Sequence, residues 1–237
     1  MNRVQIDEFL PADPGAQDLM NRITANLLFQ CTDKKSIAVT SCHAREGKSR
    51  LAVQLAYTLA MEGHKVILVD AVAAEASAFR YLTGEQDKES GKNIPDYLKG
   101  KYPLSDLYYE TEVSNLQVFP LKAYGSDASV PMNPKLLSEL LASLAKAYDF
   151  IIVDTPAAGQ ESDAAMIASA CDGIVLVVRY RKTKKKEVRE IVSQLEKTGT
   201  PILGCILNRV KFDCTLSRKR YRLLRKSLSK LKSRGKK

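Results

Sequence analysis

A lysine and a serine directly after a glycine give this chain its clearest chemical signal. Gly47, Lys48 and Ser49 follow a short apolar run, Ile37–Val39, and precede a segment whose apolar residues fall at helical spacing. A strand, a tight loop and a helix in this order are typical of a phosphate-binding site, because the start of the helix offers backbone N–H groups and the positive end of its dipole. The lysine can neutralise phosphate charge, and the serine hydroxyl can ligate Mg²⁺. These residues therefore predict binding of a nucleoside triphosphate.

The loop departs from the general phosphate-loop pattern at its first position. The pattern G-x-x-x-x-G-K-[ST] requires glycine at position 42, where this chain has Cys42. Taken alone, the loop is also compatible with a strand, a turn and a helix that contain Gly-Lys-Ser by chance. The decision between these interpretations depends on the rest of the chain.

Two aspartates stand at the ends of apolar runs further along. VILVD ends at Asp70 and FIIVD ends at Asp154. Continuous apolar runs are typical of parallel strands that are covered on both faces, and open α/β sheets bind their ligands at the carboxyl ends of such strands. An aspartate after an apolar strand is also typical of the carboxylate that holds Mg²⁺ or its water shell.

The elements around these residues alternate between strand and helix patterns. Helical spacing is found at 16–29, after Lys48 up to Gly63, and at 133–148, 162–170 and 185–199; further apolar runs lie at 116–121, 172–179 and 201–208. This order predicts an α/β fold with a doubly wound, mostly parallel sheet. We divide the chain into an N-terminal arm at 1–15, the nucleotide-binding domain at 16–210 and a C-terminal tail at 211–237, and we expect short helices in the irregular region 71–115.

The composition is typical of a soluble globular protein, with 45% hydrophobic and 27% charged residues among 237. No apolar run approaches the roughly 18 residues that a membrane span needs, and the N-terminus has no secretory pattern. The five scattered cysteines favour free thiols in a reducing compartment, and two isolated histidines are too few for a metal cluster.

The positive charge is concentrated in the tail. Residues 211–237 contain 12 Lys/Arg and one acidic residue, a net +11, so the +10 of the whole chain leaves −1 for residues 1–210. The tail is compatible with a basic amphipathic helix on an anionic membrane, through Leu223, Leu224, Leu228 and Leu231, or with a solvated disordered segment. Its most basic part, 216–237, has a single aromatic residue, Tyr221, which makes a nucleic-acid partner less favoured, and we expect none.

Together the segments TSCHAREGKS, VILVDAV and YDFIIVDTP and the final LN resemble the bacterial tyrosine kinases of capsule and exopolysaccharide synthesis. That family belongs to the P-loop NTPases of the MinD/ParA-like group, which also includes cell-division and partition ATPases. The resemblance covers about residues 16–210. It implies ATP and Mg²⁺ as cofactors and the transfer of phosphate to tyrosine.

The resemblance also implies a role for each site residue. Lys48, Asp70 and Asp154 would be catalytic, with Asp70 holding the metal or accepting the tyrosine proton. Ser49, Asp70 and Asp154 would hold Mg²⁺. The residues that would bind the nucleotide form the loop and one strand end: Ala44, Arg45, Glu46, Gly47, Lys48, Ser49, Arg50 and Asn208.

For partners, the resemblance implies a membrane polysaccharide co-polymerase that acts as activator, and thus a cytoplasmic chain at the inner face of the plasma membrane. Members of the family assemble through an E-x-x-R-x-x-R pattern in the first helix. The aligned residues here are Asp18, Asn21 and Thr24, so a homo-oligomer is possible but the motif for it is degraded.

Several departures from the family pattern keep other functions open. Arg45 stands at a position that is usually Gly or Ser, Arg50 at a usual Thr, and Val72 at the family's second aspartate. A nucleotide-binding regulatory subunit with weak or no phosphotransfer is therefore the first alternative. A partition-type ATPase is another, although His43 stands where those proteins carry a signature lysine. Tyr108, Tyr109 and Tyr221 are the candidate phosphate acceptors.

Overall fold

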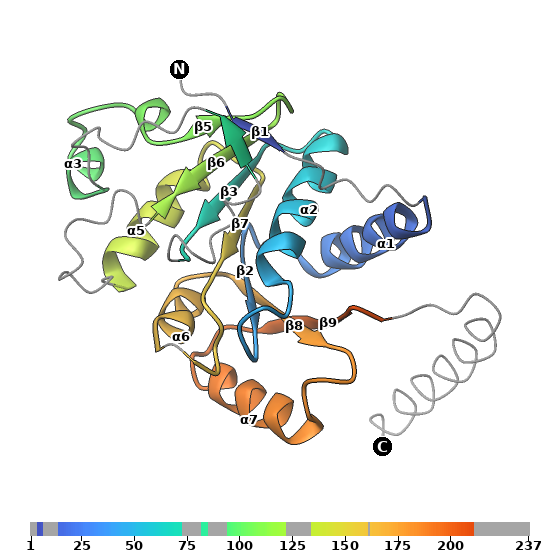
Figure 1. Cartoon of the computed structure of the whole chain (residues 1–237). Helices are drawn as coiled ribbons and strands as arrows, with labels where there is room; N and C mark the ends of the chain where they lie inside the picture. The colour runs from blue at the N-terminus through green and yellow to red at the C-terminus, as the bar shows by residue number, and fades with distance from the viewer. Residues whose placement is uncertain are drawn as a thin grey trace.

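A single seven-stranded sheet runs through the middle of the protein (Figure 1). The structure is a computed structural model that describes residues 4–6, 14–72, 82–84, 94–121, 134–160 and 162–210. The strand order is β5-β6-β3-β7-β2-β8-β9, and every neighbouring pair is parallel except β5 with β6. The strands are β2 (Ser36–Ser41), β3 (Val66–Asp70), β5 (Tyr109–Glu110), β6 (Leu116–Pro120), β7 (Phe150–Asp154), β8 (Gly173–Arg179) and β9 (Ile202–Asn208).

Helices cover both faces of the sheet. On one face lie α1 (Pro14–Gln30) and α2 (Lys48–Met61), and on the other lie α5 (Pro134–Leu144), α6 (Ser162–Ser169) and α7 (Lys185–Glu196) (Figure 1). The predicted doubly wound, mostly parallel α/β fold is therefore confirmed, and the strands and helices begin and end close to the predicted positions.

Alternation within each strand divides the core between these two helical layers. In β7, Ile152 packs on the α1/α2 side, whereas Ile151 and Val153 pack on the α5–α7 side. All five residues of β7 are buried, because a central parallel strand has a helical layer on each face. The runs VILVD and FIIVD thus correspond to β3 and β7 in the interior of the sheet, and the carboxyl ends of β2, β3 and β7 lie at one edge.

The less regular parts were predicted only in outline. The expected short helices in 71–115 are present as α3 (Ile94–Leu98) and a 3₁₀ turn, Leu104–Asp106. The antiparallel strand β5 was not predicted, nor was the separate two-stranded sheet of β1 (Val4–Ile6) and β4 (Leu82–Gly84). The basic tail 211–237, with its proposed helix and Tyr221, lies outside the described residues. None of the described helices is long and apolar enough to cross a bilayer.

Candidate nucleotide-binding site

The loop between β2 and α2 has the backbone geometry of a phosphate loop. Gly47 directly precedes α2 and has φ +96°, and no side chain caps the start of the helix. A Cβ atom at Gly47 would lie 2.2 Å from Nδ2 of Asn208, so both the left-handed φ and the close approach require glycine here. The uncapped start of α2 is compatible with the predicted binding of phosphate, which stays a prediction.

Lys48, Asp70 and Asp154 meet at the carboxyl edge of the sheet. Asp70 and Asp154 are direct register partners at the ends of β3 and β7. The ammonium of Lys48 lies 3.4 Å from Oδ1 of Asp154 and 3.1 Å from the hydroxyl of Ser49. Lys48, Asp70 and Asp154 are 6%, 2% and 0% exposed. We predicted from the sequence that these three residues lie at one edge of the sheet, and the structure confirms this arrangement.

The carboxylate of Asp154 is fully buried, and the groups around it only partly offset the cost of burying its negative charge. Burial is the main cause that raises the pKa of Asp154 to about 7; Asp70 raises it further, while Lys48 and a hydrogen bond from Ser49 lower it. Its Oδ2 is buried with no hydrogen-bond partner. A buried acceptor without a donor is uncommon in proteins, and a site for a cation or its water shell explains it.

The unpartnered Oδ2 of Asp154 allows a test of whether the residues at this site fit Mg²⁺. Mg²⁺ is bound in nucleotide sites by one or two protein oxygens together with phosphate oxygens and water. Asp154 and the adjacent hydroxyl of Ser49 supply oxygens of this kind. Among the described residues no group of three or more His, Cys, Asp or Glu side chains forms a metal site. The donor set therefore fits a metal that arrives with phosphate.

Asp70 is fixed by the chain that follows it. The backbone N–H of Val72 donates to Oδ1 of Asp70 at 3.1 Å, and the side chain of Val72 is 5% exposed. The position of the family's second aspartate is thus a buried apolar side chain here, and Asp70 is oriented by a backbone group.

The missing first glycine of the loop has a structural explanation. Cys42 is fully buried and does not adopt a left-handed φ, so its conformation does not require glycine. The glycine that permits close approach is Gly159, in the loop after β7, where a Cβ atom would lie 2.4 Å from the carbonyl oxygen of Cys42. Arg45, in contrast, does adopt φ +63°, at the position where the resembling family usually has Gly or Ser.

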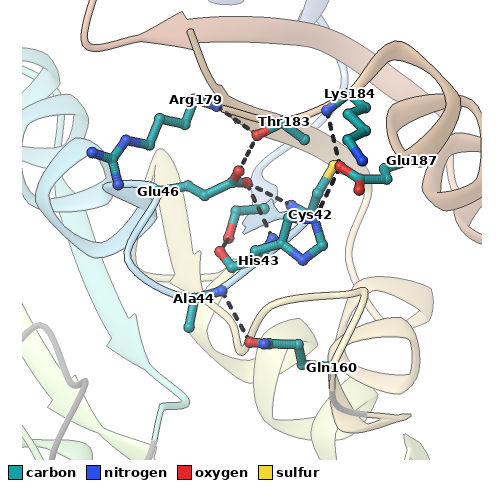
Figure 2. A network of polar contacts seen from close by, with 10 residues as sticks. Cys42, His43, Ala44, Glu46, Gln160, Arg179, Thr183, Lys184 and Glu187 are labelled. Carbon is teal, nitrogen blue, oxygen red and sulfur yellow. Dashed lines mark hydrogen bonds and ion pairs between the residues drawn. The ribbon is translucent and has the colours of Figure 1, made fainter. Parts of the chain in front are cut away.

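Glu46 makes contacts that the sequence did not reveal (Figure 2). Its side chain is 2% exposed, and Oε2 accepts hydrogen bonds from the N–H groups of Cys42 (3.0 Å) and His43 (3.1 Å). Its Oε1 accepts from the hydroxyl of Thr183, in the connection between β8 and α7. We predicted Glu46 only as part of the nucleotide-binding loop, because partners 137 residues apart leave no local pattern in the sequence.

The remaining predicted nucleotide contacts lie around this loop. Nδ2 of Asn208, at the end of β9, donates to the carbonyl of Glu46 at 2.8 Å. The N–H of Ala44 donates to Oε1 of Gln160 at 2.9 Å, and Arg50 is exposed on the first turn of α2. Direct binding of nucleotide by Ala44, Arg45, Arg50 and Asn208 stays a prediction.

The structure also bears on the candidate acceptor tyrosines and on assembly. Tyr109 is 4% exposed in β5, and Tyr108 is partly buried. In α1, Thr24 is fully buried, whereas Asp18 forms a 2.8 Å ion pair with Arg22 of the same helix. The Thr24 side chain is thus part of the interior rather than of a surface for a second chain. Among the described cysteines, all four are free thiols, as predicted.

Comparisons with known proteins agree with this geometry. A family described as AAA domain matches residues 34–208. "Tyrosine-protein kinase CpsD" of Streptococcus agalactiae is 35% identical over 219 residues, covering 89% of this chain and 91% of that protein. The kinase domain of the Escherichia coli tyrosine kinase ETK is similar in structure, with a TM-score of 0.66 and 25% identity over 86% of this chain and 82% of that one. The MinC:MinD cell division protein complex of Aquifex aeolicus shares the fold, with a TM-score of 0.61 and 22% identity over 78% and 72% of the two chains.

Proposed function

The chain belongs to the AAA domain family and, within it, to the bacterial tyrosine-protein kinases of capsule synthesis, and from this premise we propose that it transfers the γ-phosphoryl group of ATP to tyrosine and so regulates capsular or exopolysaccharide synthesis. The single observation that carries the proposal is the ion pair of Lys48 with Asp154 at the start of helix α2, which Gly47 precedes. The pair brings an ammonium that could neutralise phosphate and a carboxylate with one unbonded oxygen to the place where phosphates would bind.

In the proposed reaction, the tyrosine oxygen attacks the γ-phosphorus, the bond from that phosphorus to the ADP oxygen breaks, and the tyrosine proton passes to a base. Backbone N–H groups at the start of α2 hold the phosphates, and Lys48 neutralises the charge that develops during transfer. Asp70 is the proposed base, because Val72 orients its carboxylate at the same edge of the sheet.

Ser49, Asp70 and Asp154 are the proposed ligands of Mg²⁺. When bound, the metal supplies positive charge to the phosphate oxygens. Asp154 contributes the carboxylate whose Oδ2 lacks a hydrogen-bond partner, and Ser49 contributes a hydroxyl beside Lys48.

A nucleotide-binding regulatory subunit without phosphotransfer is the second candidate, and one observation favours it. Val72 places a buried apolar side chain where the resembling family has a second aspartate. Loss of a carboxylate from a metal site lowers the rate by up to about a thousandfold without removing the backbone groups that bind phosphate. This candidate shares the fold and the ligand with the first and differs only in transfer.

We further propose that the chain acts beside a membrane activator of polysaccharide assembly, at the inner face of the membrane. The support is the family membership together with the net +11 of residues 211–237. Each Lys or Arg close to an anionic surface contributes about 1 kcal/mol of attraction. Co-sedimentation with anionic but not neutral vesicles checks the membrane part, and equal co-sedimentation with both would refute it.

Phosphotyrosine formation by the purified chain with Mg·ATP tests the main proposal. We expect phosphotyrosine in the presence of the membrane activator and none with Lys48→Ala, with Lys146→Ala, an exposed lysine after α5, as the matched control. Tight ATP binding without phosphotyrosine would support the regulatory subunit instead. No ATP binding by the wild-type chain would refute both candidates.

A further inference from the structure

Glu46 is an anion enclosed inside a loop that we propose to bind an anion. Its carboxylate is 2% exposed and lies among backbone groups of the loop itself (Figure 2). A buried carboxylate is costly unless donors surround it, and a negative charge near a triphosphate repels it. The side chain of Glu46 therefore does not strengthen phosphate binding by direct contact, and a different role must explain its position in the loop.

The donors to Glu46 come from the start of the loop and from outside it. The N–H groups of Cys42 and His43 bind Oε2, so the carboxylate closes the loop on itself from position 46 back to position 42. These two N–H groups are thereby occupied. The N–H of Ala44 is also occupied, by Gln160. In this structure the N–H groups of positions 42–44 are therefore held by protein acceptors.

The outside donor connects the loop to the segment between β8 and α7. The Thr183 hydroxyl donates to Oε1 of Glu46, and its oxygen accepts from the N–H of Arg179 at 3.3 Å. A second contact runs in parallel, because Nε2 of His43 lies 3.3 Å from Glu187, which also accepts from the N–H of Lys184. Figure 2 shows both contacts converging on the loop from the same side.

The main chain of Glu46 is held as firmly as its side chain. Its carbonyl accepts from Asn208 of β9, and the next residue is Gly47, whose φ of +96° turns the chain into α2. The position of Glu46 thus fixes where the helix begins and where the Lys48 side chain starts. A shift of the carboxylate would move the groups that contact phosphate.

We propose that Glu46 is a positioning residue for nucleotide binding and that Thr183 is the partner through which β8 and α7 hold it in place. The inference rests on the proposed function, since it assumes that the loop binds phosphate. It assigns to Glu46 the ordering of the first half of the loop, and to the Thr183 hydroxyl the link between this loop and the β8–α7 connection.

Nucleotide affinity of the full-length chain provides the test, measured as the Kd for Mg·ADP by titration calorimetry well below the melting temperature. We expect Glu46→Gln to raise Kd about tenfold, as for other residues that orient a binding group, and Thr183→Val to raise it about threefold. The double variant should bind no more weakly than Glu46→Gln alone, because both changes break the same link. Thr183→Ser keeps the hydroxyl and should stay within about twofold of wild type.

The matched control is Glu190→Gln, the same chemical change at an exposed position of α7. A purely structural role for Glu46 predicts lower melting temperatures with unchanged Kd in every variant that is folded at the temperature of the titration, and that result would overturn the proposal. If Glu46→Gln does not fold, the Kd of the near-isosteric Thr183→Val variant for Mg·ADP provides the same test. If the wild-type chain itself does not bind Mg·ADP, the proposed function fails, whereas binding that no variant changes refutes this inference alone.

Discussion

Aspartates stand at both edges of the parallel sheet, and their surroundings differ. At the carboxyl edge, Asp154 is fully buried, and its Oδ2 has no hydrogen-bond partner. At the amino edge, Asp172 precedes β8, and its Oδ2 accepts from the N–H of Lys35 (3.1 Å) and from the N–H (2.9 Å) and hydroxyl (2.7 Å) of Ser36 at the start of β2. One oxygen of Asp154 thus has no donor, whereas one oxygen of Asp172 has three.

The pKa values follow this difference. Burial raises the pKa of Asp154 to about 7. Burial would also raise the pKa of Asp172, but the hydrogen bonds from Ser36 and Lys35 outweigh it and hold the pKa below its ordinary value of 3.8. A carboxylate stabilises the fold when donors satisfy it and destabilises the fold when they do not. At the amino edge the carboxylate thus stabilises the fold. At the carboxyl edge a bound cation could stabilise the buried carboxylate of Asp154.

The largest expected effect is on activity, at the carboxyl edge. Asp154→Asn should lower the rate of phosphotyrosine formation on the order of a thousandfold, because a neutral amide would hold Mg²⁺ more weakly than a carboxylate. The melting temperature of the nucleotide-free protein should change little, since removing a poorly compensated buried charge offsets the loss of its ion pair with Lys48. A retained rate, or a melting temperature several degrees lower, would contradict the proposed difference between the edges.

Next in size is the same substitution at the amino edge. Asp172→Asn should lower the free energy of unfolding by about 1–2 kcal/mol, because charge-assisted hydrogen bonds to the start of β2 become neutral ones at a partly exposed site. Urea unfolding measures this, and the rate per folded molecule should not change. The two variants serve as controls for each other, and equal losses of stability would remove the distinction.

The pH dependence of that stability difference sharpens the comparison. The folded-state pKa of Asp172 is lowered, so its charged form contributes stability above the unfolded-state value of 3.8, and this contribution is lost as the pH falls through the folded-state value. The gap in unfolding free energy between wild type and Asp172→Asn should therefore be full at pH 7 and narrow below about pH 4. A gap that widens on acidification would show that another group is responsible.

The smallest effect is expected at Asp149, also at the amino edge. Its Oδ2 accepts one hydrogen bond, from the N–H of Lys65 just before β3, at 2.8 Å. Asp149→Asn should cost about 0.5–1 kcal/mol of unfolding free energy, because the site is exposed and one donor is involved. Urea unfolding beside Asp172→Asn gives the ranking, and a larger loss at Asp149 would show that the number of donors does not set the contribution.

Much of the fold could be predicted because its signals are local. The run FIIVD is apolar throughout and corresponds to β7, whose five residues are all buried. The two-residue strand β5 carries no such run, and it pairs with β6 only because the chain between them turns back. Its place at the sheet edge depends on tertiary packing, which explains why we did not predict it.

The candidate site divides in the same way. Lys48, Asp70 and Asp154 each end or begin an element with a recognisable pattern, so the parallel arrangement alone predicts that they meet. The bond from Thr183 to Glu46 and the close approach of Gly159 to Cys42 join distant parts of the chain. Neither has a spacing that sequence reasoning could have detected.

The sequence by itself determined the strand-and-helix order, the glycine before α2 and the presence of a lysine and two aspartates at strand or helix ends. Only the tertiary structure decided that Oδ2 of Asp154 lacks a donor while Oδ2 of Asp172 has three, and that the carboxylate of Glu46 turns inward. The physical reason is that residue type fixes which bonds a side chain can make, whereas the packing of distant segments fixes which bonds it does make.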